Sequence, residues 1–147
     1  HLINNHNLAK ALIPGMKAVS YGRIINIIST SVKQPIPDLG VSNTIRGAVA
    51  SWAKTLAAEV GRFGITVNNI LPGFTDTARL RSFLQNIAEK KGQSIAKVTQ
   101  AMEDSVPAGR FADPDETAAA VVFLAAPQAA YINGINLPVD GGRTQSL

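Results

Sequence analysis

The sequence has 147 residues, 46% of them hydrophobic, with a formal net charge of +4 and no cysteine. The hydrophobic content excludes a disordered chain, and the length is sufficient for the core of a single domain. Without cysteine there are no disulfides or thiolate metal sites, and the two histidines, His1 and His6, are too few to propose a metal site.

Residues 1–19 are predicted to form a helix. Apolar residues recur along one side of this segment at Leu2, Leu8, Leu12 and Met16, and the Pro-Gly pair at residues 14–15 favours an end there or slightly later. No residue of the usual capping types precedes the segment, so we expect further residues upstream of this sequence.

Residues 23–28 are predicted to form a strand buried on both faces, because the run is almost continuously apolar and β-branched. Three hydroxyl side chains follow directly, on Ser29, Thr30 and Ser31. In an open parallel sheet, ligands bind beyond the carboxyl ends of the strands, which makes Ser29 a candidate site residue. The alternative is that Ser29 only closes a turn.

A βαβ unit with parallel strands is predicted next. Prolines exclude a helix in the loop 33–40, and apolar residues then recur every three or four positions over residues 43–62. Ser42 or Asn43 is the expected N-cap of this helix. Residues 65–71 are predicted to form a second apolar strand, which completes the unit.

The segment 77–110 contains two amphipathic helical pieces joined by a charged turn, and its place after a strand end predicts a helical lid or substrate loop. The alternative is that its apolar residues only pack together. Residues 113–116, Asp-Pro-Asp-Glu, have the features of a helix start and predict a helix to about residue 126. A last strand is predicted over residues 135–139.

Alternating strands and helices are typical of an α/β fold with a parallel sheet. The lysines and arginines are spread along the chain without interleaved aromatic residues, so we predict solvated helix faces rather than a nucleic-acid surface. The longest apolar runs have the length of strands, which predicts neither a membrane span nor a secretory signal.

Several motifs occur in a fixed order along the chain. Ser29, Ser42 and Arg46 are followed by ITVN at residues 65–68, PGFTDT at 72–77, PAGRF at 107–111, DPDE at 113–116 and VDGG at 139–142. Together they resemble the carboxyl-terminal half of the short-chain dehydrogenase/reductase family, most closely its 3-oxoacyl-[acyl-carrier-protein] reductase-like members. The resemblance covers almost the whole chain and implies that residues 1–147 form part of a Rossmann-type doubly wound sheet.

The resemblance also implies a function: hydride transfer between an NAD(P) cofactor and a small carbonyl or alcohol substrate, 3-oxoacyl-like, by a cytoplasmic homo-oligomer (dimer or tetramer). Ser29 matches the substrate-orienting serine, and Ser42 and Arg46 match the catalytic positions. Contacts to the nicotinamide side of the cofactor are implied for Pro72, Gly73, Phe74, Thr75 and Thr77. The alternatives are that Ser42 caps its helix, that Arg46 is a surface residue and that residues 72–73 form a plain turn.

The sequence departs from the family pattern in its chemistry. Ser42 and Arg46 replace a Tyr-Lys pair, and a serine hydroxyl is a far weaker acid than a phenol, while an arginine does not exchange its proton. The family's helix Asn falls at or next to His1, and the glycine-rich turn that holds the cofactor pyrophosphate has no counterpart before Gly15. We therefore expect a weak or altered reductase or, alternatively, a catalytically degenerate binding or scaffold subunit.

Overall fold

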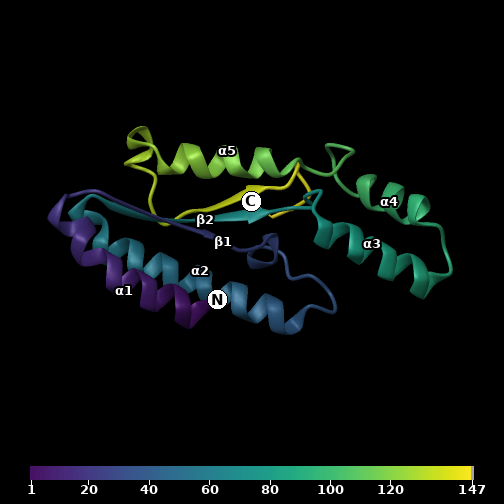
Figure 1. Ribbon diagram of the computed structural model, residues 1–147, viewed down its shortest axis with the longest axis horizontal. Helices are drawn as coiled ribbons and strands as arrows, with labels where there is room; N and C mark the ends of the chain where they lie inside the picture. The colour runs from purple at the N-terminus through teal and green to yellow at the C-terminus, as the bar shows by residue number, and fades with distance from the viewer. Residues whose placement is uncertain (147) are drawn as a thin grey trace.

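The computed structural model describes residues 1–146, which form a layered α/β fold (Figure 1). The middle layer is a parallel sheet of three strands in the order β1 (Gly22–Ile27), β2 (Ile65–Pro72) and β3 (Asn136–Val139). β2 lies at the centre and is buried along almost its whole length, which explains its largely apolar sequence, and its polar residues Thr66, Asn68 and Asn69 are buried with it. The predicted fold class, an α/β fold with a parallel sheet, is confirmed.

Helices cover both faces of this sheet (Figure 1). α1 (Leu2–Ala18) and α2 (Gly40–Val60) lie on one face, and α5 (Pro114–Ala125) lies on the other. α1 continues through Pro14 and ends at Ala18, the later of the two predicted limits. Within residues 1–146, none of these helices is both long enough and apolar enough to cross a membrane.

The main core lies between α2 and β2. Val49 and Ala53 of α2 and Ile65 of β2 have no exposed surface, and Val67 of β2 is 1% exposed. The small side chain of Ala53 lets the helix approach the sheet closely, so the βαβ unit β1-α2-β2 is firmly packed. The positions of the strand ends, and of the residues that follow them, depend on this unit.

α3 (Ala78–Lys91) and α4 (Ile95–Glu103) extend beyond the carboxyl ends of the strands and pack on each other (Figure 1). Leu84 and Ala88 of α3 and Val98 of α4 are buried in this contact. The two predicted helical pieces are therefore confirmed, and most of their apolar residues serve packing. Movement of residues 77–110 as a lid stays a prediction.

The start of α2 differs from the prediction. The helix begins at Gly40, and the N-cap position belongs to Leu39, which makes no side-chain cap bond. Asn43 Nδ2 donates instead to the carbonyl oxygen of Ile36 at 2.8 Å, which ties the preceding loop to the first helical turn. Asp38 has a φ of +64°, and this left-handed turn directs the chain into the helix early. The expectation that Ser42 or Asn43 caps the helix is wrong.

Candidate active site

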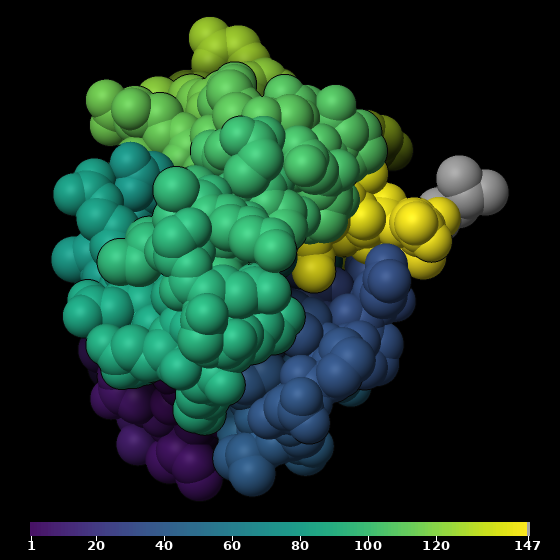
Figure 2. Space-filling model, turned by 90° about the vertical axis from the view of Figure 1, so that its right-hand side faces the viewer, coloured from purple at the N-terminus to yellow at the C-terminus, as the bar shows by residue number. Residues whose placement is uncertain are grey.

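A cavity of about 340 Å³ opens beyond the carboxyl ends of β1 and β2. Figure 2 looks at this end of the molecule, where α3, the loop after β1 and the carboxyl-terminal segment meet. Of the predicted site residues, the cavity is lined by Ser29, Pro72, Gly73, Phe74, Thr75 and Thr77. Sequence motifs separated by more than forty positions are thus brought to one place, at the sheet edge where ligands bind in folds of this kind.

Ser29 both closes a turn and faces the cavity. Its Oγ accepts a hydrogen bond from the backbone N–H of Ser31 at 3.0 Å, as the N-cap of a short 3₁₀ helix (Thr30–Val32). This bond uses an acceptor lone pair and leaves the O–H of Ser29 available to donate. Ser29 can therefore close the turn and serve as a site residue at the same time, because the cap holds its hydroxyl in place at the cavity.

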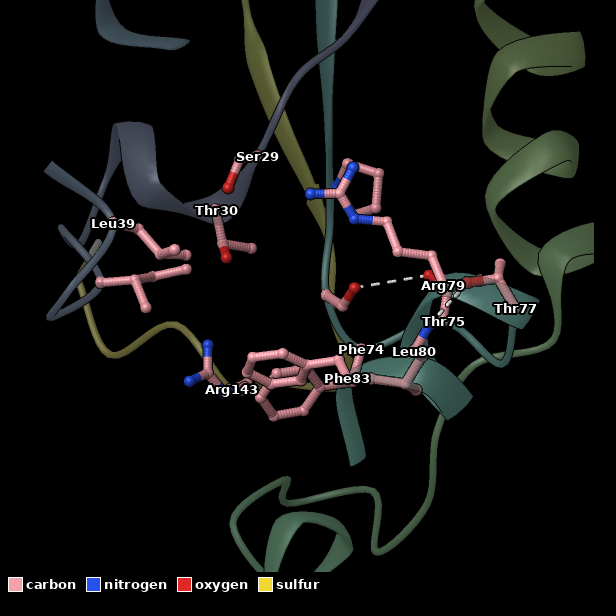
Figure 3. A pocket seen from close by; sticks show the side chains of 13 residues that line it. Ser29, Thr30, Leu39, Phe74, Thr75, Thr77, Arg79, Leu80, Phe83 and Arg143 are labelled. Carbon is pink, nitrogen blue, oxygen red and sulfur yellow. Dashed lines mark hydrogen bonds between the residues drawn. The ribbon is translucent and has the colours of Figure 1, made fainter. Parts of the chain in front are cut away.

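Thr30 is one of the three hydroxyl residues at the strand end that the sequence makes candidates for a site, although the family resemblance gives a role to Ser29 alone. Thr30 is 3% exposed, and its side chain is directed into the cavity (Figure 3). Its hydroxyl makes no hydrogen bond to any residue in the described part of the chain. This hydroxyl is therefore available to bond to a ligand in the cavity.

The segment 72–77 is held on both sides by backbone bonds. Gly73 donates to the carbonyl oxygen of Val139 at 2.9 Å, and Ala112 bonds to both Phe74 and Asp76, each at 2.9 Å. The ring of Phe74 packs edge-on against Phe111, with centroids 6.0 Å apart. One wall of the cavity is therefore fixed before any ligand binds.

The two threonines of this segment have local partners. Thr77 Oγ1 accepts a hydrogen bond from the backbone N–H of Leu80 at 3.3 Å as the N-cap of α3, and Thr75 Oγ1 donates to the carbonyl oxygen of Gly73 at 3.4 Å. The Thr77 hydroxyl, like that of Ser29, keeps its own proton free to donate. Helix capping therefore orients the hydroxyls of Ser29 and Thr77 at the cavity.

Comparisons with known proteins identify the family of this chain. A family model described as enoyl-(acyl carrier protein) reductase matches residues 2–144. The chain belongs to the short-chain dehydrogenase/reductase family. The NADPH-dependent reductase BacG of Bacillus subtilis is 33% identical over 132 residues, or 90% of this chain and 51% of that protein. The 3-oxoacyl-[acyl-carrier-protein] reductase FabG of Vibrio cholerae is 38% identical over 144 residues, or 97% of this chain and 54% of that protein.

A solved relative gives the same picture. The crystal structure of L-sorbose reductase from Gluconobacter frateurii, complexed with NADPH and L-sorbose, has a TM-score of 0.93 and 34% identity, covering 100% of this chain and 56% of that one. The chain therefore spans about half the length of the relatives it matches. The relatives that name a cofactor name NADPH, in line with the NAD(P) expected from the motifs.

The two positions of the family's Tyr-Lys pair lie outside the cavity. Ser42 is exposed and Arg46 is partly exposed, both in the amino-terminal turns of α2. Neither lines the cavity or forms a side-chain bond with residues 1–146. The two tyrosines do not replace them, because the Tyr21 hydroxyl donates to the carbonyl oxygen of Ala125 at 2.7 Å and Tyr131 is fully exposed. The catalytic roles of Ser42 and Arg46 stay predictions.

Two arginines that sequence analysis missed line the cavity, Arg79 and Arg143. They lie on segments far apart in the chain, the first turn of α3 and the stretch after β3, so only the fold brings them to the same cavity. Apolar residues complete the lining: Ile36, Leu39, Leu80 and Phe83. The only signal in the sequence was position, since Arg79 closely follows the PGFTDT motif and Arg143 directly follows VDGG.

Proposed function

We propose that the protein containing this chain is an NAD(P)-dependent reductase that transfers a hydride to the carbonyl carbon of a small molecule. The observation that carries the proposal is the cavity at the ends of β1 and β2, lined by Ser29 and by residues 72–77. BacG and L-sorbose reductase, which match this chain over most of its length, support NADPH as the cofactor. FabG supports a 3-oxoacyl-like substrate.

The residues present fit the nicotinamide end of such a cofactor, which supplies the hydride when bound. The unpartnered Thr30 hydroxyl and the free hydroxyl protons of Ser29 and Thr77 match the polar groups of a carboxamide or ribose. The cavity lining has positive but no negative side chains, so it does not repel an anionic ligand. The chain has no glycine-rich turn before Gly15 to hold the pyrophosphate.

In the proposed reaction, the chain's own residues orient the substrate and stabilise charge on its oxygen. The Ser29 O–H donates to the carbonyl oxygen, where negative charge grows as the hydride reaches the carbon. The proton that completes the alcohol comes from water, because no acid of suitable pKa within the described residues lines the cavity. This route lacks general-acid help from a phenol, so we expect turnover about 10²- to 10⁴-fold below that of a site with it.

A non-catalytic function is the second candidate. The specific observation in its favour is that Ser42 and Arg46 replace the Tyr-Lys pair and do not line the cavity. Such a protein would bind cofactor or substrate as a scaffold subunit without turnover.

The family resemblance also supports a homo-oligomer that associates through α1 and α2, whose outer surfaces carry exposed apolar residues such as Ile3 and Val41.

The test is NADPH oxidation by the full-length protein over a broad panel of ketones, with Ser29→Ala as the variant. For an enzyme we expect turnover in the unmodified protein and a loss of about 10²-fold or more in Ser29→Ala, the usual effect of removing one donor to a developing oxyanion. Ser31→Ala is the matched control, because the buried Ser31 Oγ has no partner and does not line the cavity. NADPH binding without turnover on any ketone would favour the scaffold instead.

A further inference from the structure

The cavity has an unbalanced charge. Arg79 and Arg143 line it, and no aspartate or glutamate within the described residues does. Neither guanidinium forms an ion pair or a side-chain hydrogen bond with residues 1–146. Two cations that share a small cavity repel each other, so this arrangement is stabilised when an anion enters.

The carboxylates closest in sequence are occupied elsewhere. Both oxygens of Asp76 accept hydrogen bonds from Arg81, at 3.0 and 3.1 Å, and this pair leaves Arg79 free. The oxygens of Asp140 accept the backbone N–H groups of Gly142 at 3.0 Å and Thr144 at 2.8 Å. The charge of Asp140 acts on Arg143, but the two side chains form no ion pair and Asp140 does not line the cavity. An anionic ligand would therefore give the two arginines a partner inside the cavity, where no carboxylate of residues 1–146 lies.

Arg143 is held in position for such a ligand. It is half-buried, and its guanidinium stacks on the ring of Phe74, 4.3 Å from the centroid. Its backbone N–H bonds to the carbonyl oxygen of Asp140 at 3.3 Å. In Figure 3 the Arg143 guanidinium lies beside the Phe74 ring, and Leu39 lines the same cavity, so the charge of Arg143 is presented in a partly apolar cavity. Stacking uses a face of the guanidinium and leaves its N–H groups in plane to bind an oxyanion.

We propose that the cavity selects substrates that carry a carboxylate on an apolar body. Arg143 is the specificity-determining residue, and Arg79 adds a second positive charge to the same cavity. This inference rests on the proposed function and names its substrate class. An oxyanion at the arginines has two possible sources, the substrate carboxylate and a phosphate of the dinucleotide. The Phe74 ring against Arg143 and the apolar lining of the same cavity, which includes Leu39, favour the substrate, because a dinucleotide phosphate brings no apolar surface to meet them.

The test compares hydrocinnamate, an apolar carboxylate that cannot be reduced, with its uncharged methyl ester. Binding of each to the full-length protein, with NADPH present, is measured by calorimetric titration. We expect the acid to bind about 10- to 100-fold more tightly than the ester, the effect of a charge-assisted hydrogen bond. Arg143→Met should remove this preference and leave ester binding unchanged, while Arg143→Lys should restore part of it.

Arg62→Met is the matched control. Arg62 also stacks on a phenylalanine, Phe63, at 4.8 Å, but it is exposed and lies outside the cavity, so the preference for the acid should persist. Equal affinity of the unmodified protein for acid and ester would overturn the proposal, whatever the variants do. It would also be overturned if Arg143→Met weakened NADPH binding and left the acid preference intact, because the anion would then be a cofactor phosphate.

The same titration separates this inference from the proposed function. A protein that prefers the acid but oxidises no NADPH with any ketone supports the anion site and refutes the reductase. A protein that reduces neutral ketones and binds acid and ester equally supports the reductase and refutes the anion site. If Arg143→Met does not fold, Arg79→Met tests the supporting cation, since Arg79 is exposed and its replacement disturbs no core.

Discussion

Gly73 lies where the end of β2 passes next to the residue that follows β3. A Cβ at this position would lie 2.7 Å from both the Cα and the Cβ of Asp140, closer than carbon atoms tolerate. The two segments cannot separate easily, because Gly73 donates to the carbonyl oxygen of Val139 at 2.9 Å. We expect Gly73→Ala to lower the free energy of unfolding by about 1–3 kcal/mol, measured by urea denaturation.

Gly47 provides the control for this substitution. It lies in the middle of α2, and no heavy atom comes within 4 Å of the Cβ that alanine would add. Gly47→Ala should therefore raise the free energy of unfolding by about 0.5–1 kcal/mol through helix propensity. If Gly73→Ala left the free energy of unfolding unchanged, close packing against Asp140 would not explain why residue 73 is glycine. The contact with the cofactor that the family resemblance implies would then be the remaining explanation.

Single site residues were predictable where they directly follow a buried strand. Ser29 and residues 72–77 could be assigned to the cavity because strand ends meet at one edge of a parallel sheet. Arg79 and Arg143 could not, because nothing in the sequence indicates that the first turn of α3 and the segment after β3 face the same space. Arginines on surface segments are common, and the position of these two in the cavity lining is visible only in the fold.

At the scale of elements, a row of amide side chains crosses the sheet. We call it the amide ladder: Asn26 Nδ2 donates to Asn69 Oδ1 at 2.9 Å, Asn69 Nδ2 donates to Asn136 Oδ1 at 2.8 Å, and Asn5 of α1 donates to Asn26 at 3.2 Å. Asn69 is paired in register with both neighbouring strands. An Asn that faced an apolar side chain after a slip in register would lose its hydrogen bonds, so we infer that the amide ladder helps to fix the register.

Removing the centre of the amide ladder should therefore be costly. Asn69→Leu keeps the volume similar but leaves Asn26 Nδ2 and Asn136 Oδ1 unpaired, and Asn26 is only 7% exposed. Each unpaired buried group costs about 1–3 kcal/mol, so we expect a loss of about 2–5 kcal/mol in urea denaturation. The double variant Asn26→Leu/Asn69→Leu should lose less than the sum of the single variants. Strictly additive losses would contradict a coupled ladder.

The amino terminus of α5 confirms the predicted helix start. Asp113 caps the helix, and Glu116 accepts the N–H of Asp113 at 2.8 Å in a capping box. The Arg110 guanidinium and the Asp113 N–H together lower the pKa of Glu116 from 4.5 to about 2. Both oxygens of Glu116 bond to Arg110 at 2.7 Å, which joins the PAGRF motif to the helix.

This carboxylate makes stability depend on pH in a defined range. A lowered folded-state pKa stabilises the charged form, so the contribution is complete above about pH 4.5, the unfolded value, and is lost as the pH falls toward 2. We expect Glu116→Gln to have a lower Tm than the unmodified protein at pH 7 and the difference to shrink below about pH 4.5. Glu59→Gln, at an exposed position on α2 without an ion pair in residues 1–146, should show no such difference. A difference independent of pH would mean that the ion pair is not its cause.

Element types were largely predictable, whereas the beginning of α2 was not. Largely apolar runs indicated β1 and β2, and Asp113 with Glu116 indicated α5, because each pattern has a local physical cause. The predicted burial of β1 on both faces is wrong, because β1 is an edge strand of the described sheet and its Ile27 is 49% exposed. The start of α2 depends on the left-handed turn at Asp38 and on the bond from Asn43 to Ile36, neither of which is encoded by a capping residue. The amide ladder was equally hidden, since it exists only once the strand register is known.

At the scale of the whole molecule, ionisable side chains are distributed so that few face the cavity. The ion pairs Asp76–Arg81 and Arg110–Glu116 lie on exposed surface outside it. Both histidines lie at α1, on the face of the sheet covered by α2. Within residues 1–146, Arg79 and Arg143 are therefore the ionisable side chains that line the cavity.

This distribution predicts the pH dependence of the proposed reaction. Arginine stays protonated at ordinary pH, and serine and threonine hydroxyls do not titrate there, so no cavity group in this chain changes its charge between about pH 6 and 9. With water as the proton donor, kcat/KM for carbonyl reduction should vary less than about threefold over that range. An essential titrating acid would instead change kcat/KM about tenfold per pH unit. The measurement is NADPH oxidation by the full-length protein at saturating cofactor, with Ser29→Ala expected to give a lower but equally flat profile. A tenfold change per pH unit would show that a titrating group does take part, and the proton would then not come from water alone.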